Sequence, residues 1–464
     1  MENRTLNASF LYSMKSINPY TNALIAEITE LNDQQISDII DESSSTFDTW
    51  KRTDFNVRRK LIRKVAMNLR SNNGTYASMI TAEMGKPLRE SKAEVEKCAW
   101  LCDYYAENAE RFLSPETIMT DADESYISYE PLGVILGIMP WNFPFWQAFR
   151  FIVPTLMAGN TAVLKHASNV QLSAANIENI FTDSGFPRAV FRNIPAGSDR
   201  MEKAIRHHRI MAVSLTGSGP AGEKVASIAG SVLKKTVLEL GGSNAFIVLE
   251  DADIEDAASV AVQARFQNAG QSCIAAKRFI IHSKAADQFL EKFVSNVELI
   301  KAGNPADPDT EMGPLSSITQ AETIEDQVIR SVKMGATILT GGKRDNAFYS
   351  PSVVEGVRPG MPLFDEEIFG PVAAVTIVDD AEEALKLAGS TVFGLGVSLF
   401  TRNTELAGKM AGMFHDGAVF INGLVKSDPR LPFGGTRSSG YGRELSIQGI
   451  REFVNIKSVW IRKT

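Results

Sequence analysis

The stretch that decides the fold runs from Val134 to Pro144 and reads VILGIMPWNFP. It begins as an apolar run, Val134 to Ile138, and ends in the rigid turn Pro140-Trp141-Asn142-Phe143-Pro144. Further short apolar runs that end in turn residues lie at residues 161–164, 211–215 and 245–249. Helical segments separate several of these runs. Strands that alternate with helices predict an α/β protein with parallel sheets covered on both faces.

The remainder of the chain fits the same fold class. Residues from about Asp33 to Phe112 are predicted to be helical, because good helix formers and charges are dense there. A second alternating set of strands and helices runs from about Arg278 to Phe420. The tail, Phe453 to Ile461, is predicted to be a strand. An isolated edge strand exposes unpaired backbone groups, so we expect it to pair with another segment or subunit.

Composition narrows the class of protein. The 464 residues are 44% hydrophobic and 22% charged, which is typical of a globular protein of about three domains. The net charge of −7 does not favour a nucleic-acid or anionic-membrane partner. No apolar run is long enough to span a bilayer, and residues 1–15 lack a signal-peptide pattern. We therefore expect a cytoplasmic protein.

Cysteine usage singles out one residue. Cys98 and Cys102 fall in a predicted helix and are expected to be reduced thiols. With only three cysteines and five histidines in the chain, no metal site is expected. Cys273 ends a glycine-containing turn, Phe266 to Ser272. A thiolate is a strong nucleophile toward carbonyl carbon, and the alternative is a buried structural cysteine.

Two further residues have side chains suited to carbonyl chemistry. Glu239 lies in Leu238-Glu239-Leu240-Gly241-Gly242, and a carboxylate held away from a thiol can activate water. Asn142 lies between two prolines at a strand end, and its amide can donate two hydrogen bonds to an oxyanion. The alternative for Asn142 is a rigid turn with a satisfied side chain.

Three motifs are suited to a dinucleotide. Lys165 ends a strand and can bond ribose hydroxyls, and Ser168 can cap the following helix. The segment from Thr216 to Gly222 links a strand to a helix with small residues, whose N–H groups can face a diphosphate. Glu367 can bond a ribose, and Phe369 can pack against a flat ring. The alternatives are a solvated lysine, an ordinary turn, and a capped turn with a core phenylalanine.

Taken together, the motifs resemble those of the NAD(P)-dependent aldehyde dehydrogenase superfamily over essentially the full length. The matching pieces, in the order and register of that family, are Pro140-Trp141-Asn142-Phe143-Pro144, Thr216-Gly217-Ser218, Leu238-Glu239-Leu240-Gly241-Gly242, Gly270-Gln271-Ser272-Cys273, Glu366-Glu367-Ile368-Phe369-Gly370-Pro371 and Pro432-Phe433-Gly434-Gly435. Among the subfamilies, the chain is most similar to succinate-semialdehyde dehydrogenases.

The resemblance implies an aldehyde dehydrogenase-like fold, with two open parallel-sheet α/β domains and a β oligomerisation flap. The implied dinucleotide-binding domain comprises residues 1–116 and 133–240, and the catalytic domain with the cysteine comprises residues 241–430. The flap would consist of a hairpin at residues 117–132 and a tail strand at residues 445–464. We expect a homodimer or a homotetramer.

The resemblance also implies a mechanism. Cys273 would attack the aldehyde carbon while Asn142 and the backbone N–H of Cys273 hold the oxyanion. Oxidation by NAD(P)+ would convert the thiohemiacetal to a thioester, which water activated by Glu239 would hydrolyse to a carboxylic acid. Relatives that pass the acyl group to coenzyme A usually lack this glutamate, so a free acid is the expected product.

Residues implied to bind the cofactor are Trp141, Lys165, Ser168, Gly217, Ser218, Glu367 and Phe369. Family members restricted to NAD commonly carry glutamate where Ser168 stands. A carboxylate there would repel a 2′-phosphate, so its absence predicts that either NAD or NADP is accepted.

Three residues are implied to bind the substrate. Arg150 and Ser427 match residues that hold the carboxylate of succinate semialdehyde in this subfamily, and guanidinium binds carboxylates bidentately. Gln267 departs from the pattern, because several of these enzymes carry a second arginine there, although glutamine can still donate. The predicted reaction is the oxidation of succinate semialdehyde to succinate. The alternative for Arg150 is a surface or interdomain salt bridge.

Other functions compete with this prediction. The substrate could be another small or carboxylated aldehyde, or the chain could be a catalytically silent binding protein on the same fold. A cysteine hydrolase would require a histidine base, and no histidine has an evident role beside Cys273.

Overall fold

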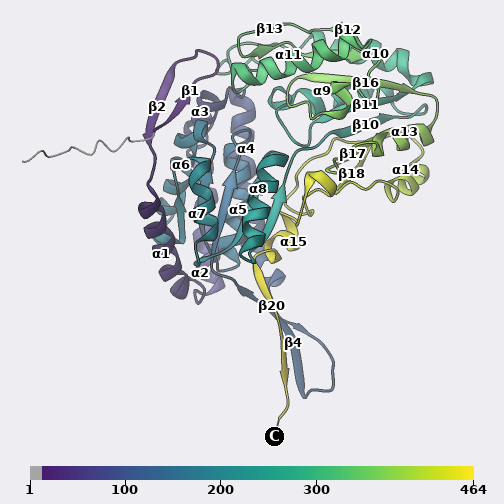
Figure 1. The fold of residues 1–464 in the computed structure, drawn as a ribbon. Coiled ribbons are helices and arrows are strands. Elements are labelled where there is room, and N and C mark those ends of the chain that lie inside the picture. The colour runs from purple at the N-terminus through teal and green to yellow at the C-terminus, as the bar shows by residue number, and fades with distance from the viewer. Residues whose placement is uncertain (1–12, 464) are drawn as a thin grey trace, which may run out of the picture.

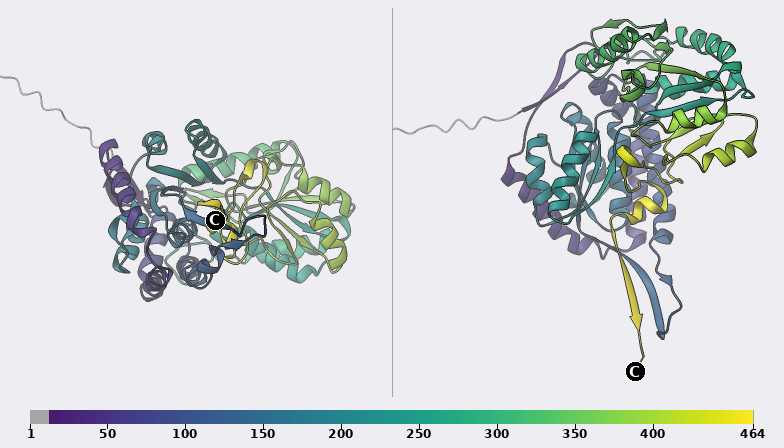
Figure 2. Two further views of the ribbon diagram at one scale, coloured as in Figure 1. Left: turned by 90° about the horizontal axis from the view of Figure 1, so that it is seen from below. Right: turned by 45° about the vertical axis from the view of Figure 1, so that its right-hand side comes forward.

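The computed structural model describes residues 13–463. Residues 1–12 of the predicted dinucleotide-binding segment, and Thr464 of the predicted tail, lie outside the described residues. Two large sheets with their helices form two lobes, and a narrow β-ribbon projects from the body (Figure 1, Figure 2).

The first sheet has six strands in the order β19-β9-β8-β5-β6-β7. Its strands are β5 (Val134–Met139), β6 (Thr161–His166), β7 (Phe191–Asn193), β8 (Ile210–Thr216), β9 (Lys235–Glu239) and β19 (Gly440–Tyr441). All neighbouring strands are parallel except β19 and β9. The run that begins at Val134 is therefore an inner strand of a parallel sheet.

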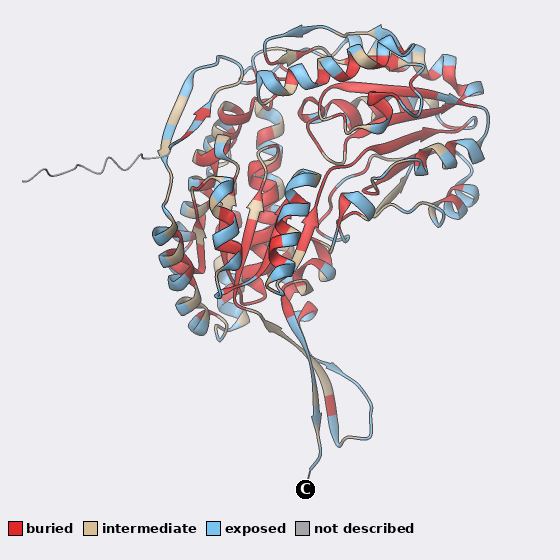
Figure 3. Ribbon diagram, in the orientation of Figure 1, coloured by how far each residue is buried: buried red, intermediate tan, exposed pale blue. Residues whose placement is uncertain are grey.

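Helices cover both faces of this sheet. They are α1 (Asp33–Trp50), α2 (Phe55–Ser71), α3 (Asn73–Met84), α4 (Leu88–Phe112), α5 (Pro144–Met157), α6 (Gln171–Asp183), α7 (Met201–Arg206) and α8 (Gly219–Ser231). In β5, Ile135 and Met139 belong to an apolar cluster with α2–α6, whereas Val134 and Leu136 belong to another with α1, α7 and α8. Both faces of a strand are thus apolar, which explains the continuous apolar run in the sequence (Figure 3).

The second sheet has seven strands in the order β12-β15-β16-β11-β10-β17-β18. These are β10 (Asn244–Val248), β11 (Ala276–His282), β12 (Thr337–Thr340), β15 (Ser352–Glu355), β16 (Val372–Val378), β17 (Val397–Phe400) and β18 (Val419–Ile421). Only the edge pair β12 and β15 is antiparallel. The prediction of two parallel-sheet α/β units is confirmed.

Helices cover this sheet in the same manner. They are α9 (Ile254–Phe266), α10 (Ser283–Glu298), α11 (Ile318–Lys333), α13 (Ala381–Gly389) and α14 (Thr404–Ala411). In β10, Phe246 packs in a cluster with α9 and α10, and Ile247 packs in another with α13 and α14. The chain passes from the first sheet to the second between Glu239 and Asn244. The domain boundaries stay predictions.

The projecting ribbon is antiparallel and consists of β3 (Glu116–Thr117), β4 (Glu124–Pro131) and β20 (Val454–Ile461). The tail strand β20 pairs along its whole length with β4, from Val454 opposite Pro131 to Ile461 opposite Glu124. Ile456 and Trp460 on this strand are 61% and 52% exposed. The tail strand therefore pairs with another segment of its own chain. Pairing with another segment and pairing with another subunit were the two predicted arrangements.

One local prediction is wrong. Ser168 does not cap the helix that follows β6, because a 3₁₀ turn, η1 (Ser168–Val170), comes first and α6 begins at Gln171. The side chain of Gln171 donates to the carbonyl of Ala167 at 2.9 Å and to that of His166 at 3.3 Å. A side chain inside the helix thus holds the loop, and no side-chain cap hydrogen bond forms at the start of α6.

Smaller elements complete the fold: β1 (Ser13–Ile17), β2 (Leu24–Thr29), β13 (Arg344–Asp345), β14 (Phe348–Tyr349), α12 (Pro362–Asp365) and α15 (Ser446–Arg451). Within residues 13–463, no helix combines the length and the apolar character needed to cross a membrane.

Candidate active site

The loop that carries Cys273 has an unusual backbone. It follows α9 as a short 3₁₀ segment, Gln267–Gly270, in which Asn268 has φ 56° and Ala269 has φ 51°. This left-handed region is unfavourable for alanine, so surrounding contacts must hold the loop. The amide Nδ2 of Asn268 donates to the carbonyl of Asn142 at 2.9 Å, and its backbone N–H donates to Glu90 Oε2 at 2.8 Å. These hydrogen bonds therefore connect the loop to the turn after β5 and to α4.

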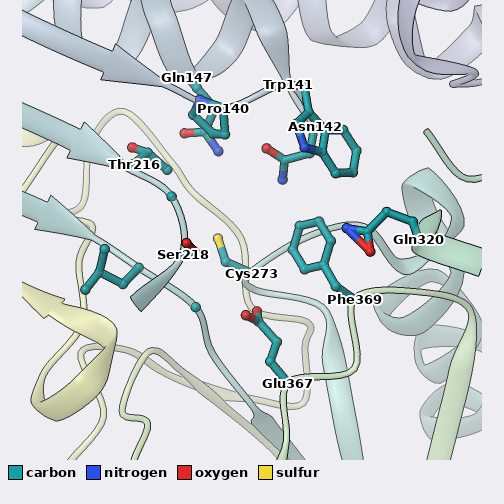
Figure 4. Close-up of a pocket in the computed structure, with 13 residues that line it drawn as sticks. Pro140, Trp141, Asn142, Gln147, Thr216, Ser218, Cys273, Gln320, Glu367 and Phe369 are labelled. Atoms are coloured by element: carbon teal, nitrogen blue, oxygen red, sulfur yellow. The ribbon is translucent and has the colours of Figure 1, made fainter. Parts of the chain in front are cut away.

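Cys273 lies where two cavities meet. One cavity has a volume of about 230 Å³, the other of about 130 Å³, and Cys273 and Gln147 line both. The larger one opens at the carboxyl ends of β5 and β8, and Figure 4 shows Cys273 in it among Ser218, Glu367 and Phe369. A molecule in either cavity can therefore reach the thiol.

The larger cavity brings together most of the predicted cofactor residues. Trp141, Gly217, Ser218, Glu367 and Phe369 line it, together with Asn142. The rings of Trp141 and Phe369 meet edge to face, with centroids 5.8 Å apart. Thr216 also lines this cavity, and its buried hydroxyl has no hydrogen-bond partner within the described chain.

Lys165 and Ser168 lie outside this lining. Lys165 is the second-last residue of β6 and Ser168 follows the end of this strand, which is the parallel neighbour of β5, so both lie at the same edge of the sheet. Lys165 is half-buried, and burial lowers the pKa of its ammonium group. Ser168 is exposed.

Two hydrogen-bond donors lie beside the thiol. Asn142 Nδ2 donates one hydrogen to the carbonyl of Gln271 at 3.0 Å, which leaves the second hydrogen of the amide for the cavity. The backbone N–H of Cys273 forms no hydrogen bond within residues 13–463. Such a pair of donors has the chemistry of an oxyanion hole.

The protein environment disfavours the thiolate at rest. Burial raises the pKa of the Cys273 thiol to about 11, although the positive charges of Arg150 and Lys277 act in the opposite direction. Lys277 Nζ donates to the carbonyl of Cys273 at 2.9 Å and to Glu367 Oε1 at 3.0 Å. Sequence reasoning missed Lys277, although a lysine inside an apolar strand that closely follows the cysteine was an available signal.

Glu239 is not brought into either cavity. It ends β9 and is buried, and its carboxyl oxygens have no hydrogen-bond partner within the described chain. A Cβ atom at Gly434 would lie 2.6 Å from Glu239 Oε1, so only glycine leaves room for this carboxyl group. Burial and the nearby Glu444 raise the pKa of Glu239 well above its usual range. This position therefore favours the protonated form of the group.

The smaller cavity brings together all three predicted substrate residues. Arg150, Gln267 and Ser427 line it with Cys273. Arg150 is buried in α5, its Nε forms an ion pair with Glu444, and its guanidinium lies 4.4 Å from the centre of the Phe433 ring. Its Nη2 has no hydrogen-bond partner within residues 13–463. The arginine thus forms a salt bridge and also faces the cavity.

Sequence reasoning missed other charged residues at this cavity. Lys97 and Glu90 of α4 both line it. Burial raises the pKa of Glu90 to about 7. Glu444, the partner of Arg150, is buried, and burial raises the pKa of its carboxyl group. The spacing of Lys97 and Glu90 in the charge-dense helix α4 does not indicate which side chains turn inward. Only the packing of α4 therefore identifies these two residues.

Histidine is absent from the lining of both cavities in the described structure. His166, at the end of β6, is buried and hydrogen-bonded through Nε2 to the carbonyl of Pro144 at 2.8 Å. A cysteine hydrolase with a histidine base therefore has no support here.

Comparison with known proteins decides the family. The sequence pattern of the aldehyde dehydrogenase family matches residues 7–459. The chain belongs to this family. It is 45% identical to a probable succinate-semialdehyde dehydrogenase [NADP(+)] of Synechocystis sp., over 97% of this chain and 100% of that relative. It is 44% identical to the succinate-semialdehyde dehydrogenase [NADP(+)] of Mycobacterium leprae, over the same shares.

Solved structures agree with the family assignment. The succinic semialdehyde dehydrogenase of Streptococcus pyogenes, in complex with NADP+, matches with a TM-score of 0.95 at 37% identity. The match covers 97% of this chain and 100% of that one. The aldehyde dehydrogenase-like fold predicted from the motifs is confirmed.

The raised pKa of the Cys273 thiol makes a prediction for its reactivity. Because the thiolate is the reactive form, alkylation by iodoacetamide without cofactor should speed up about tenfold per pH unit between about pH 7 and pH 9. Peptide mass spectrometry would follow the modification of Cys273, with the buried Cys98 and Cys102 as unreactive internal controls. A plateau below about pH 9 would mean that the thiol is acidic in the free protein.

Proposed function

We propose that this protein oxidises succinate semialdehyde to succinate with NADP+ or NAD+. The observation that carries the proposal is the position of Cys273 at the junction of two different cavities. One is lined by residues suited to a dinucleotide, and the other holds a buried arginine with an unpartnered nitrogen. Relatives at 44% and 45% identity carry the same activity in their names.

The charge of the smaller cavity supports a carboxylated aldehyde. Arg150 is paired with Glu444 through Nε, but its Nη2 is buried without a hydrogen-bond partner, and an unsatisfied buried donor is costly unless an acceptor meets it. Succinate semialdehyde has a carboxylate at one end and the aldehyde at the other. With the carboxylate at Arg150 and Ser427, the aldehyde carbon would approach Cys273, which lines the same cavity.

The chemical step begins at the thiol. Once deprotonated, Cys273 attacks the aldehyde carbon, and the oxygen becomes an oxyanion. The free hydrogen of the Asn142 amide and the backbone N–H of Cys273 would stabilise this charge. A nicotinamide cofactor in the larger cavity would supply a hydride acceptor, so that the carbon held on Cys273 could be oxidised.

Hydrolysis of the resulting thioester needs a base. Glu239 is the carboxylate that the family resemblance assigns to this role, but in its observed position burial and the nearby Glu444 favour its protonated form, and it lines neither cavity. We infer that it turns toward Cys273 and releases its proton before it activates water. The attack of water then yields the carboxylic acid and regenerates the thiol.

The larger cavity fits the cofactor. The unpartnered hydroxyl of Thr216 lies in its wall, and Gly217 and Ser218 lead into the N-terminus of α8, whose N–H groups suit a diphosphate. Glu367 would bond a ribose, and Phe369 and Trp141 would flank the rings. Ser168 places no carboxylate at the predicted 2′-phosphate position, and Lys165 adds a positive charge at that edge of the sheet. These features support acceptance of NADP.

The projecting ribbon supports a homo-oligomer. Ile456 and Trp460 are large apolar side chains on an exposed strand, and such a surface is stabilised when another subunit covers it. We propose a cytoplasmic homodimer or homotetramer whose subunits meet through β4 and β20.

The direct test of the proposed function is a spectrophotometric assay of cofactor reduction. Succinate semialdehyde and butanal would be compared as substrates, each with NADP+ and with NAD+. The proposal predicts turnover with NADP+ and a higher kcat/KM for succinate semialdehyde. No preference for the carboxylated aldehyde would refute the substrate, and no turnover with any aldehyde would refute the activity.

Replacement of Arg150 tests the carboxylate site. Arg150→Ala should lower kcat/KM for succinate semialdehyde by about 10- to 150-fold more than for butanal, because a hydrogen bond to a charged group is worth about 1.5–3 kcal/mol. Arg150→Lys keeps a charge opposite Glu444 and separates this effect from loss of the ion pair. Equal losses for both aldehydes would show that Arg150 acts only as the partner of Glu444.

A further inference from the structure

We propose that Lys97 of α4 is a second cation for the substrate carboxylate, and that it supplies the charge that Gln267 lacks. This inference rests on the proposed function, since it concerns the same carboxylated aldehyde. It adds a specificity residue from a helix that the sequence motifs did not include.

The position of Lys97 carries the inference. It lines the smaller cavity together with Arg150, Gln267, Ser427 and Cys273. Its Nζ donates to Ser427 Oγ at 2.9 Å and lies 4.2 Å from the centre of the Trp146 ring. An ammonium group has three donors, and Ser427 takes only one of them. Within residues 13–463, Lys97 forms no ion pair with a carboxylate.

The hydrogen bonds of Ser427 point to the same ligand. Its buried Oγ accepts from Lys97 Nζ at 2.9 Å and from Trp146 Nε1 at 3.0 Å. A hydroxyl has two acceptor sites and one donor, so both acceptor sites are used and the hydrogen is left to donate. A carboxylate in the cavity is an acceptor for this hydrogen, and it would also accept from Lys97.

The nearby acidic groups are already engaged. Glu94 forms a buried ion pair with Lys86 and accepts the backbone N–H groups of Phe145 and Trp146, each at 2.9 Å. Asp428 is paired with Arg430 at 2.7 Å. Neither carboxylate therefore neutralises Lys97 directly.

Glu90, which lines the same cavity, accepts the backbone N–H of Asn268 at 2.8 Å. Burial and the positive charge of Arg150 lower the pKa of Lys97 to about 8. Arg150, Lys97 and Lys426 line this cavity, and Arg150 is already paired with Glu444. The substrate carboxylate would give Lys97 the anionic partner that it lacks.

The alternative is a structural role, in which Lys97 only joins α4 to Trp146 on α5. That role would affect every substrate alike, because it concerns the wall of the cavity rather than its charge. A comparison of charged and uncharged aldehydes therefore separates the two explanations.

The test uses the full-length enzyme with NADP+ and measures the ratio of kcat/KM for succinate semialdehyde to kcat/KM for butanal. Lys97→Met removes the charge but keeps a long side chain, Lys97→Arg keeps the charge, and Lys92→Met removes an exposed lysine of the same helix that lines neither cavity. We expect Lys97→Met to lower the ratio by about 10- to 150-fold, mainly through KM. Lys97→Arg should restore much of the ratio, and Lys92→Met should leave it unchanged.

Each outcome bears on a different claim. A wild-type ratio near one would overturn the proposed substrate itself. A high wild-type ratio that survives in Lys97→Met would leave the proposed function intact and overturn the role of Lys97. A fall in both kcat/KM values without a change in their ratio would also overturn it, in favour of the structural role.

Discussion

The site depends on the hydrogen bonds that join the turn after β5 to the loop before β11. Asn142 Nδ2 donates to the carbonyl of Gln271, and Asn268 Nδ2 donates back to the carbonyl of Asn142. The turn belongs to the first sheet and the loop leads into the second, so these two hydrogen bonds connect the two lobes. They also stabilise the left-handed backbone at Asn268 and Ala269.

Burial at this junction has a chemical cost. It raises the pKa of both Cys273 and Glu239, so the described structure favours the protonated forms of the nucleophile and the base. Positive charge from Arg150 and Lys277 partly offsets this for the thiol. Activation therefore requires a change in surroundings, and the natural sources are bound ligands and rotation of the Glu239 side chain.

Much of the fold was predictable from sequence because parallel strands buried on both faces appear as uninterrupted apolar runs. Residues 134–138 were one such run. The cavity residues on turns, such as Trp141, Ser218 and Phe369, were also predictable. They belong to turn motifs that occur along the chain in the same order as in the aldehyde dehydrogenase family.

Lys97 was not predictable as a cavity contact, since its position depends on how α4 packs rather than on local pattern. The orientation of Glu239 was hidden for a similar reason. Its surroundings, Gly434 and Glu444, come from a distant part of the chain. Local sequence likewise gave no sign of the 3₁₀ turn at Ser168, which the side chain of Gln171 holds.

The central claim is that Cys273 carries the acyl group and that Glu239 activates the water that removes it. The most direct measurement is rapid mixing of Glu239→Gln with succinate semialdehyde and NADP+, followed by peptide mass spectrometry. The account predicts a burst of reduced cofactor near one equivalent per active site, a slow steady state, and a succinyl group on the Cys273 peptide. The absence of the burst, or an acyl group on any other residue, would contradict it.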